Sequence, residues 1–226
     1  MTGLSEPVDL SHVDTWIFDL DDTLYPPEAE IMAMVSERMT AFVVRQTGLP
    51  YEEARALQKG YLAEHGTTLA GLMAHHGVEP HAFLNEVHDV SLDKLIPDAE
   101  LTEALSRLPG RRLVFTNGDG KHAERILGRL EIRHLFDDVF HLETANWQPK
   151  PHPDTYRLMM ATHGVSPRSA VFFEDSPRNL MPAAQAGMTT VLVGPHAMEA
   201  DAPWVDHRAE RLAPFLKSCR VMETDR

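Results

Sequence analysis

The feature that most constrains the fold is an alternation of short apolar runs with longer amphipathic segments, most regular after Pro97. Each run has the length and the β-branched or aromatic content of a buried strand. The predicted strands are "VDTWIFDL" at 13–20, "RRLVFTN" at 111–117, "DDVFHLE" at 137–143, "SAVFFED" at 169–175, "MTTVLVG" at 188–194 and a short final strand around 204–207. Strands that alternate with helices favour a parallel sheet covered on both faces. We therefore predict an α/β fold with a doubly wound, Rossmann-like parallel sheet.

A stretch of helix-type sequence interrupts this alternation after the first strand. It begins with "PEAEIMAMVSERMTAFVVRQTG", whose apolar residues recur at helical spacing. Glycines at 48, 66 and 77 stand where helix C-caps are expected. We predict a helical domain over residues 26–93, inserted after the first strand into a core domain made of residues 1–25 and 94–226.

Composition excludes several classes of partner. The net charge of −13 opposes attraction to nucleic acid and to anionic lipid, so we expect neither as a partner. The first residues lack the basic and apolar regions of a signal peptide, and no apolar run reaches the ~18 residues of a membrane span. The single cysteine, Cys219, precludes an intramolecular disulfide and suits a reducing compartment. We expect a cytoplasmic protein, and its oligomeric state is left open.

Polar residues gather at the carboxyl ends of the predicted strands, where such sheets bind ligands. They are Asp19, Asp21 and Thr23 at the end of the first strand, Thr116, Asn117 and Gly118 at the end of the second, Lys150 in the loop after the third, and Glu174 and Asp175 at the end of the fourth. The carboxyl ends of parallel strands meet at one edge of a sheet. The sequence therefore predicts that carboxylates, a hydroxyl and a lysine gather there.

The four segments "DLDDT", "FTNG", "KPHPD" and "FFEDS" resemble, in this order, the motifs of the haloacid dehalogenase superfamily. The resemblance covers nearly the whole chain, and the helical stretch corresponds to the family's first-position cap. It implies that Asp19 is a nucleophile. A carboxylate can attack phosphorus and form an aspartyl-phosphate, which divides one difficult displacement into two easier ones.

A divalent cation is expected beside this nucleophile. Asp19 must approach an anionic phosphate, and two unit charges ~4 Å apart repel by about 4 kcal/mol at an effective dielectric constant of ~20. Oxygen ligands and retained waters suit Mg²⁺ best. The predicted ligands are Asp19, the backbone carbonyl of Asp21, Glu174 and Asp175.

The residues after the second strand predict a phosphate site. Thr116 and the amides of Asn117 and Gly118 directly precede a helix, a position that suits phosphoryl oxygens. Lys150 adds a positive charge opposite the metal. Taken singly, Thr116 could instead be a helix cap and Lys150 a solvated loop lysine.

Asp21 indicates the class of reaction. Residues two apart in an extended chain face the same side, so its carboxyl can protonate a leaving alkoxide and then activate water. The family's dehalogenases and phosphonate-cleaving members lack an acid here, so the resemblance implies phosphoester chemistry and favours a phosphatase over a phosphomutase. Asp22 stands where the family often has glycine and is interpreted as a turn residue. Thr23 is expected to hydrogen-bond near the nucleophile, and Asn179 is either an outer-shell metal ligand or a surface residue.

Two further segments, "LYPP" and "HGTTLAGL", resemble the pyrimidine 5′-nucleotidase branch, which acts on uridine and cytidine monophosphates. The expected partner is thus a small phosphorylated metabolite, in this branch a nucleotide. Tyr25 would offer an aromatic surface, and Thr67 and Thr68 would offer hydroxyls to a base or sugar. Either threonine could equally be the N-cap of the following helix.

Two alternative functions stay open. One is a sugar-phosphate phosphatase or phosphomutase on the same scaffold. The other is a noncatalytic phospho-aspartate switch like a signalling receiver, which also collects acidic residues, a threonine and a lysine at strand ends. Receivers lack a helical insertion after the first strand.

Overall fold

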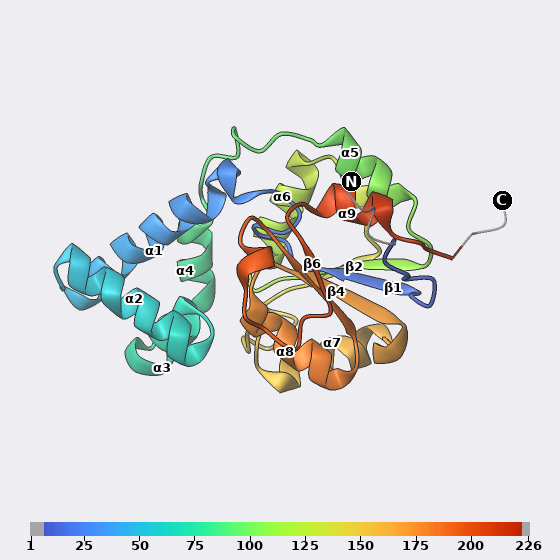
Figure 1. The fold of residues 1–226 in the computed structure, drawn as a ribbon. Helices are drawn as coiled ribbons and strands as arrows, with labels where there is room; N and C mark the ends of the chain where they lie inside the picture. Colours follow the sequence, from blue (N-terminus) through green and yellow to red (C-terminus); the bar gives the residue numbers. More distant parts are fainter. Residues whose placement is uncertain (1–6, 223–226) are drawn as a thin grey trace.

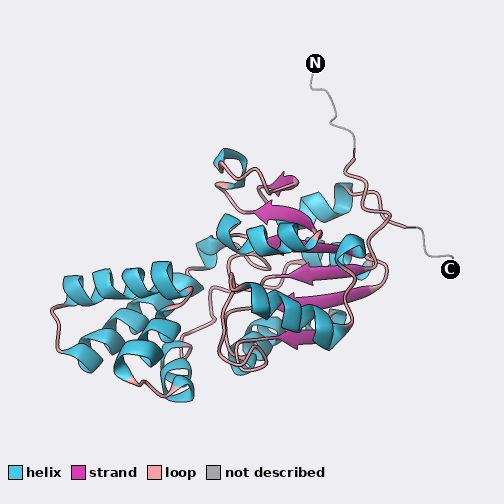
Figure 2. Ribbon diagram, turned by 90° about the horizontal axis from the view of Figure 1, so that it is seen from below, coloured by secondary structure: helices cyan, strands magenta, loops and turns pink. Residues whose placement is uncertain are grey.

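The computed structural model describes residues 7–222, and within them the strands form a six-stranded parallel sheet with helices on both faces (Figure 1, Figure 2). The strand order is β3-β2-β1-β4-β5-β6. The strands are β1 (Thr15–Phe18), β2 (Arg111–Phe115), β3 (Asp138–Phe140), β4 (Ala170–Glu174), β5 (Thr189–Val193) and β6 (His207–Ala209). The predicted doubly wound α/β fold is confirmed.

The faces of the sheet follow the alternation of side chains along each strand. Trp16 and Phe18 pack against the helices on one face, while Ile17 between them belongs to the core on the other face. The first face carries α5 (Ala99–Ser106), α6 (Gly120–Arg129) and α9 (Leu212–Ser218), and the second carries α7 (Pro153–His163) and α8 (Pro177–Ala186). Because both faces are covered, every residue of β1 is buried.

The remaining helices form a group at one side of the sheet (Figure 1). They are α1 (Ile31–Thr47), α2 (Tyr51–His65), α3 (Thr68–His76) and α4 (Pro80–Val87). The first three end at glycines 48, 66 and 77, which all have positive φ, as the sequence indicated. Short 3-10 helices occupy Pro27–Ala29, Arg133–Leu135, Pro167–Ser169 and Ala197–Glu199. In the part of the chain that the structure describes, no helix combines the length and apolarity needed to cross a membrane.

One element differs from the prediction. The last strand pairs only from His207 onward, opposite Val191, and so does not begin at 204. The carboxylate of Asp206 accepts the amide of Thr190 at 2.9 Å, which takes the place of a backbone bond there. Helix α5 ends at Ser106, and Pro109 and the positive φ of Gly110 precede the entry into β2.

The topology of the sheet decides where the strand-end residues meet. β1 lies between β2 and β4, with Phe18 in register with Val114 and Phe173. The chain turns to opposite sides of β1 to form these neighbours, which makes this edge a topological switch point. The residues that follow β1, β2 and β4 therefore come together.

Candidate active site

Lys150 connects the ends of three strands through its ammonium group. The Nζ atom donates to Asp19 Oδ1 at 2.7 Å, to Glu174 Oε2 at 2.6 Å and to the Phe115 carbonyl at 2.8 Å. The side chain is 1% exposed, so Lys150 is not a solvated loop lysine. All three of its N–H bonds have partners, which fixes the ammonium between the two carboxylates.

The charges at this point do not balance. Burial, and then the charge of Glu174, raise the pKa of Asp19 to about 7 despite the neighbouring lysine. Burial likewise raises the pKa of Glu174 to about 7. Burial would lower the pKa of Lys150, but Asp19 and Glu174 hold it above its usual range. The single positive charge of Lys150 is thus shared by two carboxylates, Asp19 and Glu174. A further cation bound beside them would be stabilised by their remaining negative charge.

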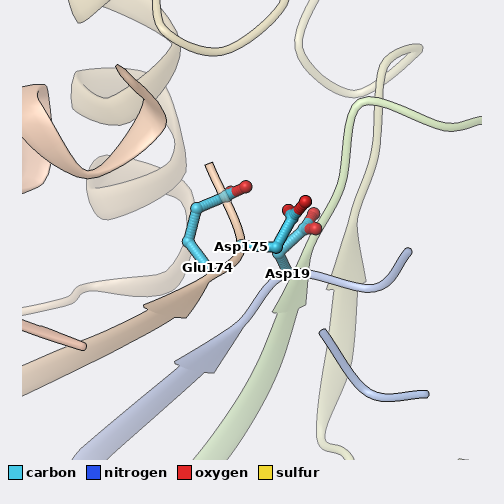
Figure 3. Close-up of side chains that lie close together, drawn as sticks. All are labelled: Asp19, Glu174 and Asp175. Carbon is cyan, nitrogen blue, oxygen red and sulfur yellow. The ribbon is translucent and has the colours of Figure 1, made fainter. Parts of the chain in front are cut away.

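Asp19, Glu174 and Asp175 form the cluster best suited to a metal ion (Figure 3). Each offers a carboxylate oxygen, and these oxygens lie within 4.8 Å of one another. Hard oxygen donors and excess negative charge fit Mg²⁺. Glu174 is the least free of the three, since Oε2 accepts Lys150 while Oε1 accepts the Ser176 amide and the Asn179 side chain. The Asn179 side chain therefore donates a hydrogen bond that helps to fix the orientation of the Glu174 carboxylate.

One oxygen of the Asp21 carboxyl is held in place, and the other has no hydrogen-bond partner among residues 7–222. Oδ1 accepts the Tyr25 hydroxyl at 2.6 Å and faces His122 Nε2 at 2.9 Å. Oδ2 lies on the side of the turn after β2, where a Cβ added to Gly118 would be 3.8 Å away. Burial would raise the pKa of Asp21, but the His122 ring and the bonds from His122 and Tyr25 hold it below its usual range. Tyr25 is 3% exposed, so its ring lies in the core. It does not present the open aromatic surface that the sequence predicted.

The predicted phosphate-binding turn is tied to the lysine loop. The Asn117 side chain donates to the Lys150 carbonyl at 3.1 Å and accepts the Lys150 amide at 2.7 Å. Thr116 Oγ1 accepts the Gly118 amide at 2.9 Å. The N-cap of α6 is Asp119, so Thr116 is not the helix cap. Thr116, Asn117, Gly118 and Lys150 thus form one connected unit beside Asp19.

The structure agrees with the prediction for Asp22 but not with the prediction for Thr23. Asp22 has φ 58°, the left-handed conformation that favours glycine, which accounts for glycine being usual there. This agrees with the interpretation of Asp22 as a turn residue. The hydrogen bond expected from Thr23 is not found, because its buried hydroxyl has no partner within residues 7–222.

The turn between α2 and α3 approaches the core through its glycine. A Cβ on Gly66 would lie 3.1 Å from the Lys150 carbonyl and 3.2 Å from Pro149 Cγ. Thr67 caps α3, since its hydroxyl accepts the Ala70 amide at 3.1 Å. Thr68 is buried and donates to the Gln58 carbonyl at 3.4 Å. Both threonine hydroxyls are thus hydrogen-bonded within the helical group. The part of this turn that lies close to the lysine loop is the backbone at Gly66.

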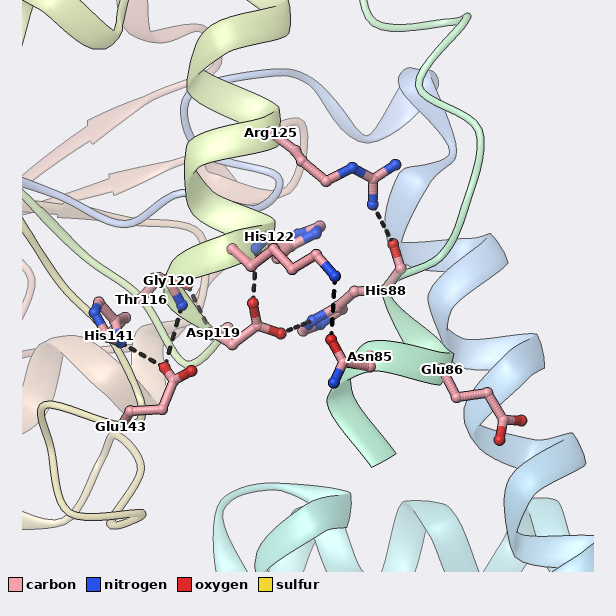
Figure 4. A network of polar contacts seen from close by, with 12 residues as sticks. Asn85, Glu86, His88, Thr116, Asp119, Gly120, His122, Arg125, His141 and Glu143 are labelled. Carbon is pink, nitrogen blue, oxygen red and sulfur yellow. Dashed lines mark hydrogen bonds and ion pairs between the residues drawn. The ribbon is translucent and has the colours of Figure 1, made fainter. Parts of the chain in front are cut away.

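Sequence reasoning did not identify the polar network of His88, Asp119 and His122 (Figure 4), which reaches Asp21 through His122. Asp119 caps α6 through the His122 amide at 2.7 Å, and its other oxygen lies 2.6 Å from His88 Nδ1. The rings of His88 and His122 stack with centroids 4.1 Å apart. One signal was available: His122 stands on the buried face of α6 with Ala123 and Ile126, directly after an active-site strand.

The pKa values of three groups in this network are shifted from their usual range. Burial would lower the pKa of His122, but the charge of Asp21 raises it above its usual range. Burial lowers the pKa of His88. Against the effect of burial, the hydrogen bond from His88 holds the pKa of Asp119 at about 2. Such clusters are frequent in functional sites.

Comparisons with known proteins agree with this geometry. The family model for haloacid dehalogenase-like hydrolases matches residues 13–187. Phosphate metabolism protein 8 of Saccharomyces cerevisiae is 28% identical over 78% of this chain and 60% of that protein. Fructose-1-phosphate phosphatase YqaB of Escherichia coli is 33% identical over 50% of this chain and 63% of that protein. The chain thus spans about three-fifths of the length of these two relatives.

A third relative performs a different reaction. The (S)-2-haloacid dehalogenase of Xanthobacter autotrophicus is 26% identical over 81% of this chain and 71% of that protein. Among solved structures, a HAD phosphatase of Thermococcus onnurineus has a TM-score of 0.62 and 20% identity over 92% of this chain and 100% of that chain, a likeness of fold. Similarity alone therefore leaves phosphoester and carbon–halogen cleavage to be distinguished by the site.

Proposed function

The chain belongs to the haloacid dehalogenase-like hydrolase family, and on that premise we propose that it is a Mg²⁺-dependent phosphomonoesterase acting through an aspartyl-phosphate. It is a hydrolase, and phosphatases are among its relatives. The observation that carries the proposal is the carboxyl of Asp21, held by Tyr25 and His122 with Oδ2 free on the side of Gly118. A phosphatase needs an acid at this place, whereas cleavage of a carbon–halogen bond releases a halide that needs no proton.

The proposed reaction has two steps. A carboxylate oxygen of Asp19 attacks phosphorus while the Asp21 carboxyl gives its proton to the leaving alkoxide. This step requires that the negative charge of the bound phosphate ester raise the pKa of Asp21, which His122 and Tyr25 otherwise hold below its usual range. Asp21, now ionised, takes a proton from water as that water attacks phosphorus, and the bond between phosphorus and the Asp19 oxygen breaks to release inorganic phosphate and the Asp19 carboxylate. The two steps return both carboxyls to their starting protonation states.

The surrounding groups would serve charge and orientation. Lys150 holds Asp19 in place and offsets part of its charge. Thr116 and the turn to Gly118 lie on the side where the phosphoryl oxygens would sit. Asp19, the carbonyl of Asp21 and Asp175, with Glu174 behind them, would hold the Mg²⁺, which supplies charge compensation for the approach of the phosphate when bound.

We further propose that residues 26–93 act as a cap over a core made of residues 1–25 and 94–226. Residues 1–6 and 223–226 lie outside the described part of the chain. The approach of Gly66 to the lysine loop supports this division, because it brings the helical group against the site. A docked cap excludes water and positions the leaving group.

The proposed substrate is a pyrimidine nucleoside 5′-monophosphate, a small phosphorylated metabolite. This rests on the "LYPP" and "HGTTLAGL" segments. Since Tyr25, Thr67 and Thr68 already have hydrogen-bond partners, the proposed contacts of these three residues with a base or sugar would require their present bonds to be exchanged. A sugar phosphate is the second candidate, which the similarity to a fructose-1-phosphate phosphatase favours.

The test is a phosphate-release screen with Mg²⁺ over nucleoside monophosphates, sugar phosphates and acyl phosphates, with a 2-haloacid assayed for halide release. We expect turnover of phosphomonoesters that EDTA abolishes and Mg²⁺ restores, and no halide. A preference for uridine or cytidine monophosphate supports the nucleotide proposal, while turnover of hexose phosphates alone removes it and keeps the phosphatase. Halide release without phosphate release would overturn the proposed function, and one-time phosphorylation without sustained release would indicate the switch.

A further inference from the structure

The buried histidine His122 touches the acid proposed for catalysis, yet no motif marks it. Its side chain is fully buried, and its Nε2 atom lies 2.9 Å from Asp21 Oδ1. Nδ1 has no hydrogen-bond partner within residues 7–222. Buried polar atoms are nearly always paired, so a histidine placed only for the core would be expected to use both nitrogens. Among the residues that the structure describes, the single polar contact of this ring is the one to Asp21.

The contact selects one orientation of the Asp21 carboxyl. Oδ1 accepts the Tyr25 hydroxyl from the same loop and lies 2.9 Å from His122 Nε2 of α6. Rotation of the carboxyl about χ2 would break both bonds. The other oxygen is therefore kept on the side of Gly118, where the leaving group of a phosphoester bound at the turn would lie.

The ring of His122 is itself held from the helical group. His88, directly after α4, stacks on it with centroids 4.1 Å apart and ring planes 19° from parallel. Arg125 of α6 donates to the His88 carbonyl at 2.6 Å and to the Val90 carbonyl at 2.9 Å. Asp119 contacts both histidines (Figure 4): its Oδ1 accepts the backbone amide of His122, and its Oδ2 lies beside Nδ1 of His88. Residues 88–90 are thus docked against the helix that carries His122.

We propose that His122 is a positioning residue that aims the Asp21 carboxyl at the leaving group, and that His88 makes this alignment depend on docking of the helical group. The proposal rests on the proposed phosphatase function. Positioned acids contribute about 10²–10⁴ to rate. Misplacement by about 1 Å can cost about a hundredfold. Loss of the aligned Asp21 carboxyl should slow only those reactions whose leaving group needs a proton, so the test compares two leaving groups.

The experiment compares two leaving groups in single-turnover rapid-quench measurements, which isolate transfer to Asp19. Uridine 5′-monophosphate or fructose 1-phosphate, whichever is turned over, releases a poor alkoxide that needs the acid. 4-Nitrophenyl phosphate releases a phenolate that does not. We expect His122→Leu to slow the alkyl ester by about tenfold to a hundredfold and the aryl ester by less than about threefold. His122→Gln, whose amide nitrogen can replace Nε2, should recover most of the loss.

The role of His88 is measured in the same assay. His88→Ala removes the stacked ring and should reproduce the leaving-group-dependent loss, while His88→Phe keeps a ring against His122 and should lose less. His163→Leu is the matched control, because that histidine lies beside Asp138 at the opposite edge of the sheet. Thermal unfolding of each variant identifies any that fail to fold, and His122→Gln then carries the test.

Equal loss with both leaving groups, or no recovery in His122→Gln, would overturn the positioning role while leaving the phosphatase proposal intact. A wild-type protein that releases no phosphate from any phosphomonoester would remove both proposals together.

Discussion

The ammonium of Lys150 lies 2.7 Å from a carboxylate oxygen of Asp19, and both side chains are almost wholly buried. The same ammonium reaches Glu174 at 2.6 Å. A buried ion pair of this kind contributes little beyond its desolvation cost while intact, but the loss of one partner leaves an uncompensated charge. The stability of this edge of the sheet and the proposed chemistry therefore depend on the same lysine.

Lys150→Met should destabilise the protein by about 3–5 kcal/mol, because two buried carboxylates lose their only cation among the described groups that touch them. Urea unfolding at neutral pH measures this. Lys217→Met is the control, since Lys217 pairs with Glu103 at the surface and should cost at most about 1 kcal/mol. Similar losses in the two variants would contradict the interpretation of Lys150.

Asp19→Asn should abolish phosphate release, with a loss of at least about a thousandfold, because an amide oxygen cannot form the aspartyl-phosphate. Mass spectrometry of the acid-quenched wild-type protein should detect the phosphorylated peptide, and that of the variant should not. Asp22→Asn is the matched control in the same loop. Asparagine tolerates the φ of 58° found there, so that variant should stay within a few-fold of wild type. Normal turnover in Asp19→Asn would remove the proposed mechanism.

Asp119 should stabilise the protein at moderate pH and lose this effect in acid. Its pKa is held at about 2, below the ordinary 3.8, so the unfolded chain takes up the proton first as pH falls. The contribution is therefore present above pH ~4 and disappears toward pH ~2.

Asp119→Asn measures that contribution, because asparagine still caps a helix while the charge is lost. The variant should be less stable than wild type by about 2 kcal/mol near pH 6, and the gap should narrow as pH falls from about 4 toward about 2. Urea unfolding of both proteins across this range is the measurement. A gap that stays constant with pH would show that the charge of Asp119 is not responsible.

The glycine at the α2–α3 turn should matter for activity as well as stability. Gly66→Ala and Gly77→Ala both place a side chain at positive φ, and each should cost about 1 kcal/mol. Only at Gly66 would the new Cβ meet the lysine loop, whereas nothing lies within 4 Å of the corresponding position at Gly77.

Gly66→Ala should therefore lower kcat/KM for phosphomonoesters several-fold while Gly77→Ala leaves it nearly unchanged. Steady-state kinetics and urea unfolding of the two variants separate the effects. Equal kinetic losses would show that the contact between Gly66 and the lysine loop has no role in turnover.

The sequence by itself determined the fold class and the place of most strand-end residues. Buried strands are short apolar runs, and their alternation with amphipathic helices is local information. A parallel sheet then brings the ends of its strands to one edge, so the neighbourhood of Asp19, Thr116 and Glu174 follows from order along the chain. The turn role of Asp22 and the glycine helix ends are equally local, since each depends on one residue's backbone angles.

Only the tertiary structure decided which polar atoms meet. His122 and Asp21 are 101 positions apart, and their contact depends on how α6 packs over the loop after β1. The full burial of Lys150, the turn of Tyr25 into the core and the pairing of Thr67 and Thr68 within the helical group depend on the same long-range packing. Hydrogen-bond partners are selected by distances of a few tenths of an ångström, which the spacing of residues along a chain does not contain.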